Sequence, residues 1–379
     1  MRREYKYIVV GAGASGLMFT SLMREKSDIL IIDSNSKIGA KIAISGGGKC
    51  NITNKNVSSS NYTADSSFVD SVLDSFTQTD LLKWLEARGV VPHIRDGGEY
   101  FCQRSSEEII ALFAREIRGT TLSLDTTVSA TSYGDRGFKV ETSRGWFVAP
   151  NLIVASGGLS FPKIGASAIG HTIASGFGHT ITPTSPALVG FTLQPEQFFM
   201  KELSGSSLDI TMRVGDKSFN GAILFAHRGI SGPVVLNTSV YWKKGNISID
   251  FIPTLSIREI KNSKKQISTL LPIPKRVAKA LLKAIDLEDK TAKSMSPKEW
   301  NILEGLHDYS FAPAGTFGYS KAEATRGGVS ISEIDSDSMM SRLIKNLYFL
   351  GEVTEVTGEL GGYNLQWAFS SAYRCADNL

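Results

Sequence analysis

The sequence has little cysteine and no long apolar run, and each absence excludes a class of protein. Only three of its 379 residues are cysteine and none forms a CxxC pair, which argues against a disulfide scaffold and a CxxC redox centre. No run approaches the roughly 18 apolar residues that cross a membrane, so no membrane partner is expected. The polar start, MRREYKY, leads directly into an apolar strand and predicts no signal peptide. Together these features predict a cytoplasmic protein.

Metal ligands and a strong charge bias are also missing. The five histidines show no metal-ligand spacing, and we expect no metal site. The net charge of +4 is too small by itself to indicate a nucleic-acid partner. What the chain has in excess is glycine, with 36 residues that fall in clusters. Such clusters are typical of tight turns and of sites where the backbone approaches a phosphate.

The first glycine cluster lies between two short apolar strands. Residues 8–10 run into Gly11-Ala-Gly13-Ala-Ser-Gly16, a helical pattern follows, and the second strand ends on Asp33. This order is the fingerprint of an adenine-dinucleotide site. Gly11 permits the tight turn, Gly13 lets the backbone approach a pyrophosphate at the helix start, and Gly16 lets helix and strand pack closely. Asp33 has the right spacing to bind ribose hydroxyls.

Four later stretches repeat this glycine chemistry. The loop Ser45–Asn54 contains three consecutive glycines, which indicates an anion or cofactor contact, with a flexible surface loop as the alternative. An apolar strand ends at Ala155-Ser-Gly157, where small residues suit a chain passing beneath a dinucleotide or an ordinary strand end. A buried strand delivers Gly351-Glu352. The turn Gly361-Gly362 opens a helix whose start could stabilise negative charge on a reduced ring.

The middle of the chain has a different texture. Residues 187–253 form short β-like runs separated by turns, which predict a small antiparallel sheet or barrel. Within it, His227–Pro233 sets a histidine and an arginine beside a glycine-serine turn, which suits either a substrate contact or a capped turn. Residues 257–286 are helical in pattern, broken by two prolines, with eight basic residues against one acid between 258 and 283. This favours a solvated helical face over a nucleic-acid surface.

Before that region, apolar spacing predicts a helix over residues 67–88 and another over 107–118, opened by Ser105 or Ser106. Residues 122–128 and 138–142 alternate like strands, and the second pairs across a turn at 134–137 with the preceding stretch. We expect three segments: residues 1–187 as the N-terminal part of a cofactor domain, 188–319 as an inserted β-rich then helical domain, and 320–379 as the C-terminal part of the cofactor domain.

Several of these motifs together resemble one family. They are Gly11–Gly16 with Asp33, Ile44–Asn54, Ala155–Pro162, His227–Pro233, Thr325–Val329, and Gly351 through Ser371. The chain resembles the BaiN-like family of bacterial FAD-dependent oxidoreductases, also labelled aminoacetone oxidase-like or 3-dehydro-bile acid reductase-like. The resemblance spans nearly the whole chain. It implies an α/β fold of the two-dinucleotide-binding flavoprotein type, with a Rossmann-like FAD domain and inserted β-barrel-like and helical subdomains.

The resemblance also implies roles for single residues. Those implied to bind FAD are Gly11, Gly13, Ala14, Ser15, Gly16, Asp33, Lys41, Ser45, Gly46, Gly47, Cys50, Asn51, Val128, Ala155, Ser156, Gly157, Gly351, Glu352, Gly362, Tyr363, Asn364 and Leu365. The chain departs from the family at Asp33, where glutamate is commoner, and at Phe101-Cys102, where the family pairs phenylalanine with proline.

The sequence therefore predicts an FAD-dependent oxidoreductase that moves a hydride between flavin and a small organic substrate, an enone-type double bond or an amine, with NAD(P)H as a possible electron donor. The candidate catalytic proton donors are His227, Arg228 and Tyr363, with His227 first because its ordinary pKa is near neutral. The alternatives are a flavoprotein acting on RNA, of the tRNA-modification type, and a non-catalytic flavin-binding redox sensor. A nucleic-acid partner is the less favoured alternative because of the modest net charge, and the oligomeric state is open.

Overall fold

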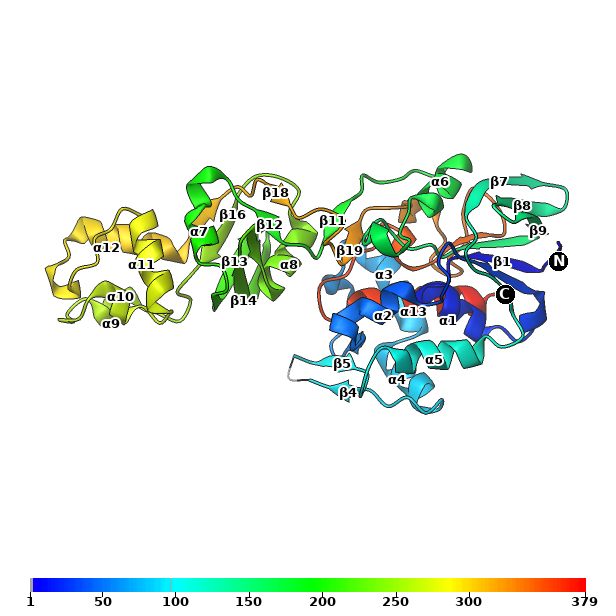
Figure 1. The fold of residues 1–379 in the computed structure, drawn as a ribbon, viewed down its shortest axis with the longest axis horizontal. Coiled ribbons are helices and arrows are strands. Elements are labelled where there is room, and N and C mark those ends of the chain that lie inside the picture. The colour runs from blue at the N-terminus through cyan, green and yellow to red at the C-terminus, as the bar shows by residue number, and fades with distance from the viewer. Residues whose placement is uncertain (1–2, 96) are drawn as a thin grey trace. The chain divides into compact units, whose positions relative to one another are not determined.

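The computed structural model describes residues 3–95 and 97–379 (Figure 1). The chain divides into two compact units: unit 1 comprises residues 1–186 and 323–379, and unit 2 comprises residues 187–322. The expected segment limits at 187/188 and 319/320 lie one and three residues from these divisions, and the functional division into domains stays a prediction. In the described part of the chain, no helix is long and apolar enough to cross a membrane.

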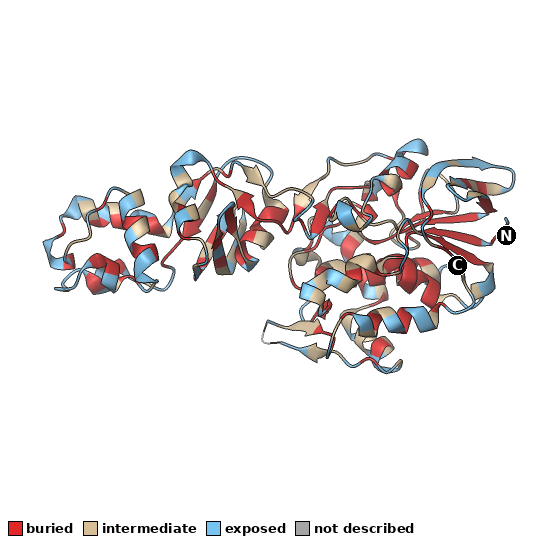
Figure 2. Ribbon diagram, viewed as in Figure 1, coloured by how far each residue is buried: buried red, intermediate tan, exposed pale blue. Residues whose placement is uncertain are grey.

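Unit 1 is built on a five-stranded parallel sheet. Its strand order is β20 (Leu347–Phe349), β10 (Asn151–Val154), β1 (Tyr7–Val10), β2 (Ile29–Ile32) and β6 (Thr121–Ser123). Every residue of β1, β2 and β10 is buried (Figure 2). Strands that are apolar along their whole length form this kind of sheet because both of its faces are covered.

Helices cover one face of this sheet and a small antiparallel sheet covers the other (Figure 1). The helices of unit 1 are α1 (Ala14–Leu22), α2 (Ala40–Ile44), α3 (Ser66–Ser75), α4 (Gln78–Glu86), α5 (Glu107–Glu116), α6 (Ile169–Gly176) and α13 (Tyr363–Asp377). The smaller sheets are β7 (Val128–Gly134), β8 (Gly137–Thr142) and β9 (Gly145–Ala149); β3 (Asn51–Asn54), β5 (Glu99–Phe101) and β4 (His93–Ile94); and the pair β11 (Ser185–Ala187) and β19 (Ala324–Arg326).

Two expectations for unit 1 need comment. The predicted turn at 134–137 is confirmed, with Gly134 paired to Gly137, but the predicted strand over 122–128 is wrong, because β6 ends at Ser123 and the strand that pairs with β8 begins at Val128. The single helix predicted over 67–88 is instead two helices, because Thr77 starts a new one with a capping box. The Asp80 amide donates to the Thr77 hydroxyl (3.3 Å), and the Thr77 amide donates to the Asp80 carboxylate (3.1 Å).

Unit 2 combines an antiparallel sheet with a helical part. The sheet order is β17 (Tyr309–Phe311), β16 (Ile247–Asp250), β13 (Ser207–Val214), β14 (Lys217–Ala226), β15 (Gly229–Ser231), β12 (Phe191–Thr192) and β18 (Gly315–Thr316). The helices are α7 (Phe199–Glu202), α8 (Pro233–Tyr241), α9 (Ile257–Ile260), α10 (Ile267–Leu270), α11 (Lys275–Ala284) and α12 (Pro297–Glu304). The predicted helical stretch 257–286 is thus three helices. The last begins directly after Pro274, which cannot donate a helical hydrogen bond.

Candidate cofactor site

The first glycine cluster closes the carboxyl end of β1. Gly11 has φ +115°, and a Cβ there would lie 2.3 Å from the Ala155 carbonyl oxygen, so no other residue fits. A Cβ on Gly16 would lie 2.1 Å from the Gly11 oxygen, since α1 packs directly on the turn. By contrast, a Cβ on Gly13 would meet nothing within 4 Å. Gly13 is also the N-cap of α1, whose first residues Ala14 and Ser15 follow it, and no side chain caps this helix start.

That open, uncapped helix start has the chemistry of an anion site. The first amides of a helix have no intrahelical partners and lie at the positive end of the helix dipole. With no side chain on Gly13 and none capping the helix, a pyrophosphate can take the place of a cap. The glycine pattern therefore divides into two roles, in which Gly11 and Gly16 serve packing and Gly13 leaves space.

Asp33 follows β2 and is fixed by the turns around it. Its carboxylate accepts hydrogen bonds from the Ala12 amide (2.6 Å) and the Asn35 amide (2.8 Å). The Asp33 carbonyl accepts the Thr126 amide (2.9 Å), which brings the segment leading to Val128 beside it. Val128, half-buried at the start of β7, thus lies two residues from a direct contact with the Asp33 backbone. This neighbourhood suits an adenosine, with ribose at the acid and adenine along the adjoining backbone.

The triple-glycine loop folds as its sequence requires. Gly46 and Gly47 have φ values of +55° and +66° in the turn that begins at Ser45, and a Cβ on Gly47 would meet nothing within 4 Å. The loop leads to Cys50, which is fully buried, and to Asn51 at the start of β3. The Asn51 side-chain oxygen is buried and has no hydrogen-bond partner. A buried polar atom without a partner is costly in a folded protein, so this position suits a bound group that supplies a donor.

Cys50 faces a second thiol that sequence reasoning did not place. Asn51 pairs with Phe101 across β3 and β5, so Cys50 and Cys102 are cross-strand neighbours, joined by the Cys102 amide donating to the Cys50 carbonyl (3.4 Å). A hydrogen bond from the Cys102 side chain lowers the pKa of the Cys50 thiol in spite of its burial. The only signal for this contact in the sequence was Cys102 itself, which occupies the position where the family more often has proline.

Lys41 and Glu352 join the beginning and the end of the chain. The Lys41 ammonium lies 2.6 Å from the Glu352 carboxylate. Glu352 also accepts the Thr325 amide (2.8 Å). Gly351 has φ +69°, and a Cβ on it would lie 2.7 Å from the Ser15 hydroxyl oxygen. The predicted contacts on α2 and after β20 therefore meet at the helix start that follows β1.

The strand end at 155–158 completes this edge. The Ala155 amide donates to the Val10 carbonyl (2.9 Å), and the chain leaves β10 through Ser156 and Gly157. Thr325, whose role sequence reasoning missed, holds the next turn, because its hydroxyl accepts the amides of Leu159 (2.7 Å) and Ser160 (3.2 Å). The sequence signal for this role was the place of Thr325 in the Thr-Arg-Gly-Gly motif. The ends of β1, β10 and β20 thus come together, as expected for a ligand site in a parallel sheet.

The C-terminal glycine turn packs against the triple-glycine segment. Gly362 (φ +93°) is the N-cap of α13 without a side-chain cap, and a Cβ there would lie 2.6 Å from the Thr53 backbone. Burial raises the pKa of Tyr363 to about 12, so its phenol is neutral near pH 7. The Asn364 side chain is engaged with Gly358, accepting from its amide (2.9 Å) and donating to its carbonyl (2.9 Å). Asn364 and the half-buried Leu365 can therefore offer a ligand mainly backbone groups.

The remaining candidate proton donors belong to unit 2. His227 and Arg228 form the two-residue turn between β14 and β15, and both are exposed. The Arg228 guanidinium lies over the Phe317 ring, 5.4 Å from its centroid. The predicted glycine-serine turn and helix after them are present, with Pro233 as the first residue of α8. Their catalytic role stays a prediction.

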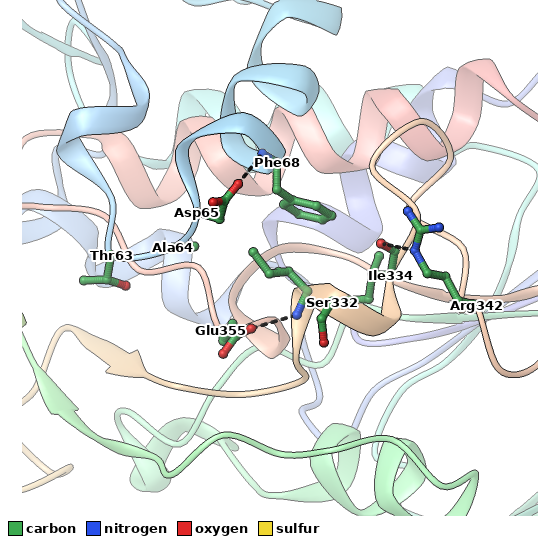
Figure 3. Close-up of a pocket in the computed structure, with 9 residues that line it drawn as sticks. Thr63, Ala64, Asp65, Phe68, Ser332, Ile334, Arg342 and Glu355 are labelled. Atoms are coloured by element: carbon green, nitrogen blue, oxygen red, sulfur yellow. Dashed lines mark hydrogen bonds between the residues drawn. The ribbon is translucent and has the colours of Figure 1, made fainter.

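A pocket elsewhere on unit 1 has a different character. It is lined at the start of α3 by Asp65 and Phe68, and on the opposite side by Ser332, Arg342 and Glu355 (Figure 3). Asp65 caps α3, Arg342 donates to the Ile334 carbonyl (3.1 Å), and Glu355 accepts the Ile331 amide (2.8 Å). None of the predicted cofactor residues lines it. Because its charged groups serve local structure, this pocket is a weaker site candidate than the glycine-lined edge of the sheet.

Comparison with known proteins decides the family. The model of the HI0933-like protein Rossmann domain matches residues 5–378. The chain belongs to the HI0933-like family. The ribosomal RNA dihydrouridine synthases of Haemophilus influenzae and Escherichia coli K12 are 38% and 35% identical to it, each alignment covering 99% of this chain and 98% of the relative. The 3-dehydro-bile acid delta(4,6)-reductase of Clostridium scindens is 26% identical over 96% of both chains.

This HI0933-like chain also shares its fold with a solved enzyme. The 3-ketosteroid delta1-dehydrogenase of Sterolibacterium denitrificans aligns over 100% of this chain and 99% of its own, with a TM-score of 0.50 and 14% identity. The resemblance to BaiN-like FAD-dependent oxidoreductases is confirmed, and so is the predicted Rossmann-type fold. The chain is an FAD-dependent oxidoreductase. The glycine-lined space and the Asn51 oxygen fit a long dinucleotide such as FAD. Among the described residues, no cluster of side chains could hold a metal ion.

Proposed function

We propose that this flavoenzyme reduces a carbon–carbon double bond conjugated to a carbonyl group, and that its substrate is a uracil ring in ribosomal RNA. The observation that carries the proposal is the pair of ribosomal RNA dihydrouridine synthases, which match at 38% and 35% identity from end to end. The uracil ring is an enone-type system, since its C5–C6 double bond is conjugated to the C4 carbonyl. The sequence-based hypotheses of enone reduction and of action on RNA thus become one.

The reaction needs a hydride and a proton. Bound FAD, reduced by NAD(P)H, would supply the hydride to C6 of uracil. A protein group or water then delivers the proton to C5, so that one double bond is lost and two hydrogens are gained. The residues that hold the cofactor are the glycine turns after β1, β10 and β20, the acid Asp33, and the loop Ser45–Asn51. The N-terminus of α13 at Gly362 is suited to stabilise negative charge that develops next to it.

His227 stays the sequence-based candidate for the proton donor, and within unit 1 Tyr363, at the start of α13, is the candidate group next to the predicted cofactor residues. A general acid is most effective when its pKa is near the working pH, and the ordinary pKa of histidine meets that condition. Tyr363, with a pKa of about 12, is a weak acid but a dependable hydrogen-bond donor, suited to orienting a carbonyl group. Arg228 would add positive charge next to His227.

The second candidate is a small-molecule enone, favoured by the bile-acid reductase relative at 26% identity. A direct competition separates the two. The protein is reduced anaerobically with NADPH or NADH, and the return of the flavin absorbance is followed after mixing with in-vitro transcribed ribosomal RNA, with transfer RNA, or with a steroid enone. Rapid reoxidation by unmodified ribosomal RNA alone supports the proposal. Reoxidation by the steroid enone but by neither RNA would overturn the choice of substrate and leave the reaction class standing.

A further inference from the structure

Helix α11 of unit 2 buries one side and presents only cations on the other. Its buried residues are Val277, Ala278, Leu281 and Leu282, and its exposed charged residues are Lys275, Arg276, Lys279 and Lys283. The helix contains no acidic residue. An ordinary solvated helix mixes both signs of charge, since neighbouring acids and bases at a spacing of four stabilise it. The charge on the first two turns of α11 is therefore not explained by the needs of the helix.

Two placements on α11 act against its own stability. Lys275 and Arg276 lie in the first turn, where the helix dipole is positive and cations are unfavourable. Lys275, Lys279 and Lys283 follow one another at intervals of four, so they repel along one face. Arg276 donates to the Glu202 carbonyl, which gives it a structural role. Lys283 lies in the last turn, where a cation is favourable, but Lys275 and Lys279 have no such explanation, and within the described residues no ion pair involves any of the three lysines.

We propose that Lys275, Lys279 and Lys283 bind the phosphate backbone of the RNA substrate. This inference rests on the proposed function. Four helical residues rise about 6 Å, so the three ammonium groups form a line about 12 Å long that can follow a chain of phosphates. The wider surroundings are also positive, because unit 2 carries 18 lysines and arginines against 12 acids, whereas the rest of the chain carries 23 against 25. The near-neutral total hides this asymmetry.

The chemistry of α11 favours RNA over the other anionic partners. A helix that lies on a membrane exposes large apolar side chains beside its cations, and protein interfaces have an apolar or aromatic centre. The large apolar residues of α11 are instead buried in the core of unit 2. A face with positive charge and no accessible apolar area is suited to neutralising phosphates. That kind of binding needs neither an apolar nor an aromatic centre.

A second group of cations accompanies the first. Lys264, Lys265 and Lys293 are exposed on two segments joined by backbone hydrogen bonds, the Ala292 amide to the Lys265 carbonyl (3.0 Å) and the Lys293 amide to the Ser263 carbonyl (2.9 Å). Segment 263–271 includes α10, which packs against α11. The helical part of unit 2 therefore presents several cations from a small scaffold, which suits binding to more than one phosphate.

The test compares two triple variants of the full-length, FAD-loaded protein. The first is Lys275→Gln/Lys279→Gln/Lys283→Gln, which keeps side-chain length and good helix formers. The matched control is Lys243→Gln/Lys244→Gln/Lys321→Gln, which removes three exposed lysines from elsewhere in unit 2. Dissociation constants for in-vitro transcribed ribosomal RNA are measured over a range of salt concentrations. Far-ultraviolet circular dichroism and the flavin spectrum check that both variants fold.

We expect the α11 variant to bind ribosomal RNA at least about tenfold more weakly at moderate salt. The slope of log K against log salt should fall by about 2, since each lost phosphate contact removes about 0.7 to 0.9. The control should bind as the unmodified protein does. Equal binding of ribosomal RNA by both variants would overturn this assignment. So would unchanged RNA binding by the α11 variant together with weaker binding to vesicles containing phosphatidylserine, measured in parallel. If the unmodified protein itself shows no salt-sensitive binding to ribosomal RNA, the result contradicts the proposed RNA substrate, and the α11 assignment falls with it.

Discussion

The two units of this chain use their sequence in opposite ways. Unit 1 has positive-φ glycines after β1, β10 and β20 and, after its triple-glycine loop, a buried Asn51 oxygen without a partner. Unit 2 has an ordinary β-sheet core and a helical part whose exposed charge is biased to one sign. Both features are unfavourable for folding alone, and each is explained by an anionic ligand: a dinucleotide for unit 1 and a polynucleotide for unit 2. The difference shows how an overall net charge near zero can hide a basic surface.

The largest expected effect separates packing glycines from ligand glycines in unit 1. Gly11→Ala places a methyl group against the Ala155 carbonyl at positive φ, so it should cost about 3 kcal/mol or more and abolish FAD retention. Gly13→Ala meets no protein atom, so the free energy of unfolding of the apoprotein should change by less than about 0.5 kcal/mol. Its methyl group would still enter the pyrophosphate space. Urea denaturation and FAD titration measure both quantities, and an unchanged FAD affinity in Gly13→Ala would contradict the site.

The next prediction asks which unit contributes the proton. His227→Ala should lower turnover about a hundredfold, the lower range for a general acid, and leave FAD binding unchanged. Tyr363→Phe should lower turnover about tenfold, since it loses an orienting hydrogen bond. Single-turnover reoxidation of the reduced flavin by substrate measures both. A larger loss in Tyr363→Phe than in His227→Ala would move the acid from unit 2 to unit 1.

A smaller effect tests the buried oxygen of Asn51. Asn51→Leu removes an oxygen that has no partner in the protein alone and a long amide hydrogen bond to Glu99 (3.5 Å), so the stability of the apoprotein should change by less than about 1 kcal/mol. FAD affinity should nevertheless fall by about tenfold, the value of one lost hydrogen bond of about 1.4 kcal/mol. A loss of FAD affinity without a comparable loss of stability makes the test specific. A variant that loses stability and keeps its affinity for FAD would show that the oxygen serves the fold.

The smallest effect is the pH dependence of stability. Burial lowers the pKa of His171 and of His179, both in unit 1, so these rings are neutral in the folded protein over a wider range than in the unfolded chain. The unfolded chain therefore binds more protons once the pH falls below about 6.5. Stability from these groups is fully present above that value and is lost as the pH falls through the folded pKa values. Urea midpoints at pH 7.5 and 5.5 measure the change, and replacing His179 with glutamine should reduce it.

Local patterns predicted much of this molecule. The strands, the glycine turns with their positive φ angles and the FAD family follow from Gly11–Gly16, Asp33 and the triple-glycine loop, because steric rules act within a few residues. Contacts between distant segments could not be predicted. The packing of Gly362 against Thr53 has no signal in either segment alone, and the cross-strand contact of Cys50 with Cys102 has only the departure from the family's proline at Cys102.

The basic residues between 258 and 283 in unit 2 were difficult to interpret for a different reason. Its sequence predicted a solvated helical face, since the average charge of the whole chain argued against a nucleic-acid partner. The charge of the inserted segment could be counted from the sequence, but only the folded helix α11 shows which lysines share an exposed face. The split at Thr77 teaches the same lesson on a smaller scale, because a capping box overrode continuous apolar spacing.

The most direct test of the account is the product itself. Ribosomal RNA transcribed in vitro is incubated anaerobically with the FAD-loaded protein and NADPH or NADH, digested to nucleosides and analysed by mass spectrometry. We predict a uridine product heavier by two hydrogens, formed at defined positions and absent when either the protein or the nicotinamide is omitted. Ribosomal RNA that stays unreduced, while the same preparation reduces a steroid enone, would contradict the central claim.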